Sequence, residues 1–188
     1  MKINEYFKDI HNLLSNASVT DKKGKAILSD DAFDKIILLI FGLKQENNKL
    51  IFIGNGGSAS IASHMATDFL KNGGFPAIAF NDASLITCVS NDLGYENVFK
   101  KPLDMLANKG DLLVSISSSG RSPNILHATQ AAKKKSCPII TLSGFDSDNP
   151  LRRLGEINFY IKSRSYGYVE IAHSTICHYI LDTIIEKT

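Results

Sequence analysis

The sequence predicts an α/β fold: a three-layer α/β/α sandwich on a five-stranded parallel sheet, with two extra N-terminal helices. Three observations support this prediction. From residue 49 onward, short apolar runs alternate with stretches of helical periodicity, which is typical of βαβ units. The apolar runs are continuous, as expected of strands buried on both faces. Glycine-rich and serine-rich turns follow two of these runs, at the strand ends where open parallel sheets bind ligands.

The two N-terminal helices come first in the chain. Apolar residues recur at helical spacing over residues 3–14 and predict the first helix. Residues 16–25 are polar and are predicted to be a connection. Ser29 is an N-cap candidate for a second, strongly apolar helix that runs to about residue 47.

Strands and helices then alternate to the end of the chain. The strands are expected at residues 50–53, 77–80, 112–116, 139–142 and 157–161. The helices are expected at residues 58–72, shortly after residue 82, and at residues 96–108, 122–135 and 168–186. Pro123 stands in the first turn of its helix, where the missing N–H breaks no hydrogen bond.

Length, composition and charge exclude several classes of protein. The 188 residues are enough for one domain with a substantial core, without disulfides or a structural metal. We expect a single domain over residues 1–188, with helices in 1–48 used for oligomerisation and the α/β core in 49–188. A net charge of +2 argues against a nucleic-acid partner. Three widely spaced cysteines favour a reducing cytoplasm. The longest apolar run is too short to span a bilayer, which argues against a membrane as a partner.

The first ligand-type loop is GNGGS at residues 54–58, between a strand and a helix. Its glycines allow positive φ and a close approach of the backbone to a ligand, and the helix N-terminus favours an anion. It is not a P-loop, because no Lys-Ser/Thr pair follows. The looser dinucleotide form GxGxxA is present, so a nucleotide-binding oxidoreductase is one alternative, and a tight turn without a ligand is another.

The second such loop is SSSGRS at residues 117–122. Four hydroxyls and several backbone N–H groups at a helix N-terminus form a good phosphate cradle. Arg121 either adds charge to this cradle or points to solvent, and plain helix capping is the alternative role of the serines. A dinucleotide needs one loop of this kind. Two loops on alternate strands indicate a small phosphorylated ligand held from both sides.

Imidazoles and carboxylates occur on two of the predicted helices. His64 and Asp68 are four residues apart and therefore share a helix face. Glu170 and His178 are two turns apart on the last helix and share a broad face, whereas His173 points elsewhere. Such a set suits an acid/base site or a divalent-metal site. Taken singly, each residue is equally compatible with a structural role.

In combination, these motifs resemble those of one family. The segment GNGGSAS from residue 54, the segment NDLGY from residue 91, the segment SISSSGRSPN from residue 115 and a terminal helix with His178 occur in the same order in it. The chain resembles the sugar isomerase (SIS) domain proteins and, among them, the phosphoheptose isomerases. The resemblance covers nearly the whole chain and implies the flavodoxin-like, doubly wound SIS fold.

The resemblance also implies a set of functional residues. The implied sugar-phosphate-binding residues are Asn55, Gly56, Gly57, Ser58, Asn91, Asp92, Ser117, Ser118, Ser119 and Ser122. The implied catalytic residues are Asp68 or Glu170 as the base and His178 as the acid. The implied ligands of a divalent ion, with zinc as the candidate, are His64, Asp68, Glu170 and His178. No nucleotide cofactor is implied.

Two residues depart from the family pattern. The family usually has Glu at the position of Asp68, and Gln at the position of Glu170. Which of the two carboxylates is the base therefore stays open. Altered groups next to a substrate often accompany an altered substrate, so an isomerase for a different sugar phosphate is an alternative.

The activity that the resemblance implies is aldose–ketose isomerisation. Sedoheptulose 7-phosphate would become D-glycero-D-manno-heptose 7-phosphate through an enediol, and would supply heptose for bacterial surface polysaccharide, either lipopolysaccharide or capsule. The implied assembly is a cytoplasmic homotetramer with active sites between subunits. A non-catalytic SIS module, which senses a sugar phosphate or binds a protein, is the second hypothesis.

Overall fold

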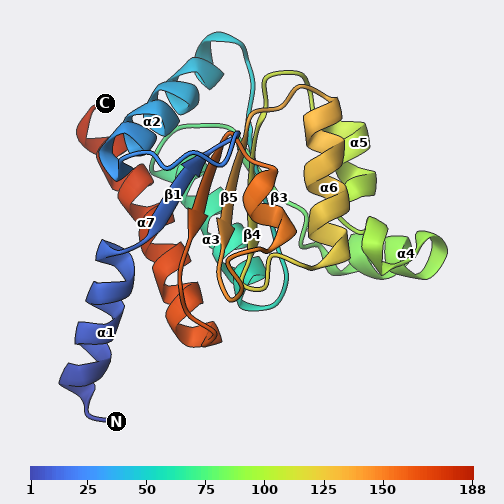
Figure 1. Cartoon of the computed structure of the whole chain (residues 1–188). Coiled ribbons are helices and arrows are strands. Elements are labelled where there is room, and N and C mark those ends of the chain that lie inside the picture. The colour runs from blue at the N-terminus through green and yellow to red at the C-terminus, as the bar shows by residue number, and fades with distance from the viewer.

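A six-stranded sheet forms the centre of the computed structural model, which describes residues 1–188 (Figure 1). Its strand order is β1-β6-β5-β4-β2-β3. Five strands run parallel and confirm the predicted ones: β2 (Leu50–Gly54), β3 (Ala77–Ala79), β4 (Leu112–Ser117), β5 (Ile139–Ser143) and β6 (Ile157–Tyr160). Every residue of β2, β4, β5 and β6 is buried, as their continuous apolar runs predict.

The sixth strand, β1 (Ser18–Asp21), lies in the segment predicted to be a connection, and that prediction was wrong. It pairs antiparallel with β6 at the edge of the sheet. Its sequence is polar because only Val19 and Thr20 are buried. The buried Asn158 side chain of β6 holds it, donating to the carbonyl oxygens of Thr20 and Asp21, each at 3.3 Å. The sheet is therefore mixed rather than purely parallel.

Helices cover both faces of the sheet. They are α1 (Ile3–Ser15), α2 (Ser29–Gln45), α3 (Gly57–Lys71), α4 (Ala83–Leu93), α5 (Lys100–Leu106), α6 (Pro123–Lys134) and α7 (Tyr166–Glu186). Side chains of α2, α3 and α7 form one apolar core with the sheet, and side chains of α5 and α6 form the other. Helix α1 contributes no buried residue and extends away from the body of the molecule (Figure 1).

The helix predicted over residues 96–108 is divided in the structure. A 3-10 turn, η1 (Tyr95–Asn97), precedes the shorter α5. Pro102 is the third residue of α5, and proline lacks the N–H of a helix interior, so it is accommodated only in a first turn. A second 3-10 turn, η2 (Pro150–Arg153), was not predicted; it is capped by Asn149, whose side chain accepts from the Arg152 N–H.

The parallel strands have the order of a doubly wound sheet, with a reversal between β2 and β4. The helix that follows β2, α3, packs on one face, and the helix that follows β4, α6, packs on the other. Ligands of such sheets bind where the strand order reverses, beyond the carboxyl ends of the strands. The glycine loop follows β2 and the serine loop follows β4, so both predicted ligand loops meet at this point.

His173 of α7 is fully buried against the sheet. Its Nε2 lies 3.2 Å from the Ser143 carbonyl oxygen, and its Nδ1 has no partner. Burial lowers the pKa of His173 from 6.5 to about 4, partly opposed by the hydrogen bond to Ser143. The imidazole is therefore neutral at pH 7 and serves packing.

This burial predicts a pH-dependent stability. The unfolded imidazole binds a proton near pH 6.5 and the folded one only near pH 4, so the free energy of unfolding falls as the pH drops between these values. The contribution is about 3 kcal/mol at most. Urea unfolding at about pH 7.5 and about pH 4.5 measures it. We expect a smaller loss at low pH for His173→Gln than for the wild type, and equal losses would contradict the prediction.

No helix combines the length and the apolar character needed to cross a membrane.

Candidate active site

The glycine and serine loops line one pocket at the carboxyl ends of β2 and β4. Its volume is about 280 Å³. The lining residues are Asn55, Gly56, Gly57, Ser58, Ser117, Ser118, Ser119, Ser122, Tyr166 and Glu170. Eight of the ten predicted substrate-binding residues are in this set. The structure therefore brings the two predicted phosphate-type loops to the same small, polar hollow.

The glycine loop turns sharply from β2 into α3. Gly56, the residue before α3, has φ +55°, a conformation that favours glycine. A side chain on Gly54 would collide with the backbone of Ser58. The position that a side chain on Gly57 would occupy is filled by the carboxylate of Glu170. No side chain caps the N-terminus of α3, so its first N–H groups are available to an anion in the pocket.

The serine loop turns from β4 into α6 in a similar way. Gly120 has φ +61°, and the Asn149 side chain fills the space where its Cβ would lie. The Ser122 side chain makes no capping bond at the N-terminus of α6. The Ser118 hydroxyl is buried and has no hydrogen-bond partner. Buried hydroxyls are normally paired, so this oxygen is suited to a ligand in the pocket.

An amide pair with the buried Asn124 holds the half-buried Asn55 at the wall of the pocket. Asn55 Nδ2 donates to Asn124 Oδ1, and Asn124 Nδ2 donates to Asn55 Oδ1, both at 2.9 Å. The Ile125 N–H also donates to Asn124 Oδ1, which fixes the orientation of both amides. The Tyr95 hydroxyl donates to Asn55 Oδ1 at 3.1 Å. One N–H of Asn55 remains free to donate to a ligand.

Sequence reasoning assigned no role to Asn124 or Tyr95. Both stand inside motifs that carry the resemblance to the family, namely SISSSGRSPN and NDLGY. The available signal was their place in these motifs, but the contact joins residues 69 positions apart. Only the fold reveals that contact.

A second group of polar side chains lies between α3 and α7. His64, Asp68 and His178 each offer a ligand atom, and these atoms lie within 4.8 Å of one another. His64 Nε2 is 3.2 Å from Asp68 Oδ2, and the rings of His64 and His178 are 5.3 Å apart. Two imidazoles and one carboxylate, with a fourth position open, are a typical donor set of catalytic zinc sites. This group therefore fits a divalent metal.

Within one chain, Glu170 does not belong to this group. It lines the pocket of the two loops, whereas His178 is eight residues further along α7. Eight residues of helix span about 12 Å. The predicted four-residue ligand set is therefore split in one chain into a group of three and a separate carboxylate.

Asn91 and Asp92 do not line the pocket either. They are exposed near the end of α4, where Asn91 Nδ2 donates to Asp92 Oδ1 at 2.8 Å. The Cys88 thiol lies 3.7 Å from Asp92 Oδ2. In one chain, these two predicted sugar contacts are therefore paired with near neighbours.

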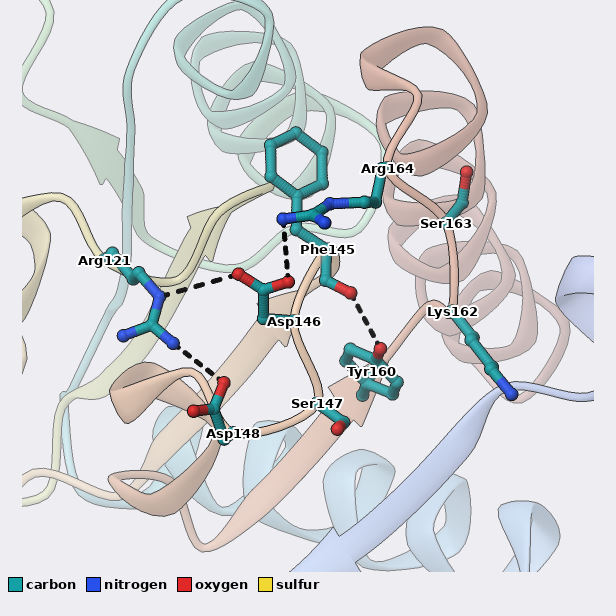
Figure 2. Close-up of a pocket in the computed structure, with 9 residues that line it drawn as sticks. All are labelled: Arg121, Phe145, Asp146, Ser147, Asp148, Tyr160, Lys162, Ser163 and Arg164. Atoms are coloured by element: carbon teal, nitrogen blue, oxygen red, sulfur yellow. Dashed lines mark hydrogen bonds and ion pairs between the residues drawn. The ribbon is translucent and has the colours of Figure 1, made fainter.

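Arg121 is turned away from the serine pocket. Figure 2 shows it in a neighbouring hollow of about 650 Å³, which it lines together with Asp146, Asp148 and Arg164. Arg121 Nη2 lies 2.7 Å from Asp148 Oδ1, and Asp146 also pairs with Arg164 at 3.0 Å. Of the two roles considered for Arg121, the structure favours the one that points to solvent: the residue is exposed, and its charge is paired with aspartates beyond the phosphate-type loop.

Comparison with known proteins agrees with this geometry. The SIS domain model matches residues 5–144. The chain is similar to proteins named phosphoheptose isomerase from Proteus mirabilis, at 36% identity over 84% of each chain, and from Salmonella dublin, at 34% identity over 95% of each chain.

Solved structures give the same result. The structure of a phosphoheptose isomerase from Francisella tularensis matches with a TM-score of 0.83 and 27% identity, over 99% of this chain and 97% of that one. A phosphoheptose isomerase from Neisseria gonorrhoeae matches with a TM-score of 0.80 and 26% identity, over 97% of each chain. The α/β sandwich predicted from the sequence is confirmed. This chain belongs to the phosphoheptose isomerase family of SIS-domain proteins.

Proposed function

We propose that this protein is an aldose–ketose isomerase that converts sedoheptulose 7-phosphate to D-glycero-D-manno-heptose 7-phosphate. The observation that carries the proposal is the convergence of two uncapped helix N-termini and a serine loop on one small pocket. That arrangement suits the phosphate of a small sugar. Relatives that are about 35% identical to this chain carry the name phosphoheptose isomerase, which supplies the class of substrate, a heptose phosphate.

The phosphate end serves as the handle that positions the reacting end. Ser117, Ser118, Ser119 and Ser122 would bind the phosphate, and binding energy gained there orients the carbonyl end. A carboxylate, Asp68 or Glu170, removes a proton from C1 of the ketose while an acid protonates the carbonyl oxygen, which gives the enediol. The C1 hydroxyl then loses its proton and C2 gains one, which completes the aldose. His178 is the acid.

Active sites between subunits account for the division of these residues in one chain. Glu170 and His178 are about 12 Å apart along α7, which is too far for one reacting carbon to meet both. A second copy that places its His178 group over the loop pocket of the first would complete the site. The same contact offers a partner to the exposed Asn91 and Asp92.

The surface of the chain supports such an assembly. Helix α1 has no buried residue, and its Ile3 and Phe7 side chains are 63% and 58% exposed. Tyr6 of α1 stacks on Tyr168 of α7, with ring centroids 4.8 Å apart, so the two helices offer one continuous surface. Helix α1, within the segment 1–48 predicted to serve oligomerisation, would then join the copies of a homotetramer, in which buried apolar contact replaces exposed side chains.

A divalent ion, with zinc as the candidate, would be held by His64, Asp68 and His178. When bound, it polarises the substrate's carbonyl and stabilises negative charge on the enediol oxygens. A group from a second copy, its Glu170 included, is available as a further ligand. In the same group, a ring nitrogen of His178 lies within 4.8 Å of a carboxylate oxygen of Asp68, so a carboxylate is near the imidazole that would transfer the proton.

The product would supply heptose for bacterial surface polysaccharide, with lipopolysaccharide and capsule as the two destinations. A cytoplasmic location stays a prediction from the cysteine content; the three cysteines are free, and two of them are buried.

Incubation of the protein with sedoheptulose 7-phosphate in D₂O, followed by NMR, tests the proposal. We expect the aldose to appear with deuterium at C2, with faster turnover after zinc is added to chelator-treated protein. Conversion of another ketose phosphate, without conversion of sedoheptulose 7-phosphate, would show that the substrate is a different sugar phosphate. Binding of the sugar phosphate without exchange at C2 would favour the non-catalytic module.

A further inference from the structure

The largest hollow in the structure lies at the opposite end of the sheet from the candidate active site. It is a groove of about 1130 Å³ between α2 and the amino ends of the strands. Leu112 and Ile157, the first residues of β4 and β6, stand at its inner wall, and Lys133 near the end of α6 closes one side. The groove shares no residue with the pocket of the two loops. It therefore requires its own explanation.

The floor of the groove is apolar and open. It is formed by one face of α2, with Leu38, Leu39 and Gly42 at helical spacing. Leu38 is 70% exposed although it stands in the middle of a helix. Gly42 destabilises a helix interior relative to alanine, and no atom lies within 4 Å of the position that its Cβ would occupy. The glycine thus leaves the helix backbone open to close contact from the groove.

The rim of the groove carries an excess of positive charge. Five lysines line it against three acidic residues. Lys22 is paired with Glu156 at 3.5 Å, whereas Lys23, Lys25, Lys35 and Lys133 form no ion pair. The lysines come from three elements: the turn after β1, α2, and the end of α6. This rim therefore attracts an anion from several sides of the apolar floor.

We propose that this groove, called here the lysine groove, is a second ligand site, which binds an anionic amphiphile. The hydrocarbon part would lie over Leu38, Leu39 and Gly42, and a carboxylate or phosphate head would meet the lysines. The volume is close to the range of small-ligand sites. A free small amphiphile fits this combination better than a protein partner does, because lysines from three elements border the apolar floor.

Binding of dodecyl phosphate, measured by calorimetry below its micelle concentration, tests the proposal. We expect saturable binding of one molecule per chain to the wild-type protein. Gly42→Phe fills the groove and should weaken binding at least tenfold, whereas the matched control Gly42→Ala, which adds one methyl group, should stay within about threefold. The double variant K35E/K133E reverses two charges without filling the groove, and should also weaken binding at least tenfold.

Three results would overturn the proposal. The first is equal affinity of Gly42→Phe and the wild type, with circular dichroism showing that both are folded. The second is equal binding of dodecyltrimethylammonium, which carries the opposite charge. The third is a change of oligomeric state in Gly42→Phe or K35E/K133E, seen by light scattering, which would make the groove a contact between copies. None of these measurements depends on the isomerase activity.

Discussion

Replacement of His178 by alanine is expected to lower kcat on sedoheptulose 7-phosphate by ~10²–10⁴-fold, the usual contribution of a positioned acid or base. The side chain is only half-buried, and it contacts polar groups, His64 and Asp68, rather than the apolar core. The substitution therefore removes the proposed proton donor and metal ligand without opening a core cavity. NMR of the sugar phosphates measures the rate, and thermal unfolding verifies that the variant is folded.

The matched control is His127→Ala. His127 is exposed on α6, away from both polar groups, and its loss should leave kcat within about twofold. Metal analysis gives an independent readout, because His178→Ala should retain less zinc than the wild type while His127→Ala retains as much. A kcat of His178→Ala within tenfold of the wild type would remove the group of His64, Asp68 and His178 from the mechanism.

The part of the fold that depends on local pattern was predictable from the sequence. Continuous apolar runs become strands when helices cover both faces of the sheet, and glycine or proline marks where the helices begin and end. Strand β1 escaped prediction because an edge strand needs only two buried residues, Val19 and Thr20, and because the distant Asn158 holds its backbone at Thr20 and Asp21. Its stability comes from a partner 137 or more residues away, which no local window detects.

The candidate site also has a part that local sequence predicts and a part that depends on distant contacts. The two loops were predictable because glycine and serine at a helix N-terminus have a local physical meaning. The separation of Glu170 from His178 followed from helix geometry alone, yet the resemblance placed both at one site. The direction of Arg121 depends on Asp146 and Asp148, which belong to a different loop. The interaction partner of a side chain is thus decided by the residues that the fold brings near it.

Asn124 is an example of a tertiary contact that positions a residue of the site. We expect the second large effect on activity when Asn124 is replaced by alanine. The variant leaves Asn55 without its reciprocal partner, so the amide is free to rotate and the pocket loses a fixed donor. We expect kcat/KM to fall ~10- to 100-fold, which corresponds to one or two hydrogen bonds to a ligand, each worth about 1.4 kcal/mol. Stability should fall by about 1–3 kcal/mol, because buried polar groups lose their partners.

Thr129→Val separates these two effects. Thr129 is buried on the same helix and bonds to Ser115 at 2.8 Å, without touching Asn55. Its loss should lower stability by about 1 kcal/mol and leave kcat/KM unchanged. Tyr95→Phe, which removes the weaker bond to Asn55, should lie between Asn124→Ala and the wild type in kcat/KM. If Asn124→Ala and Thr129→Val reduce kcat/KM equally, the effect is general destabilisation, and Asn124 does not position Asn55 for the ligand.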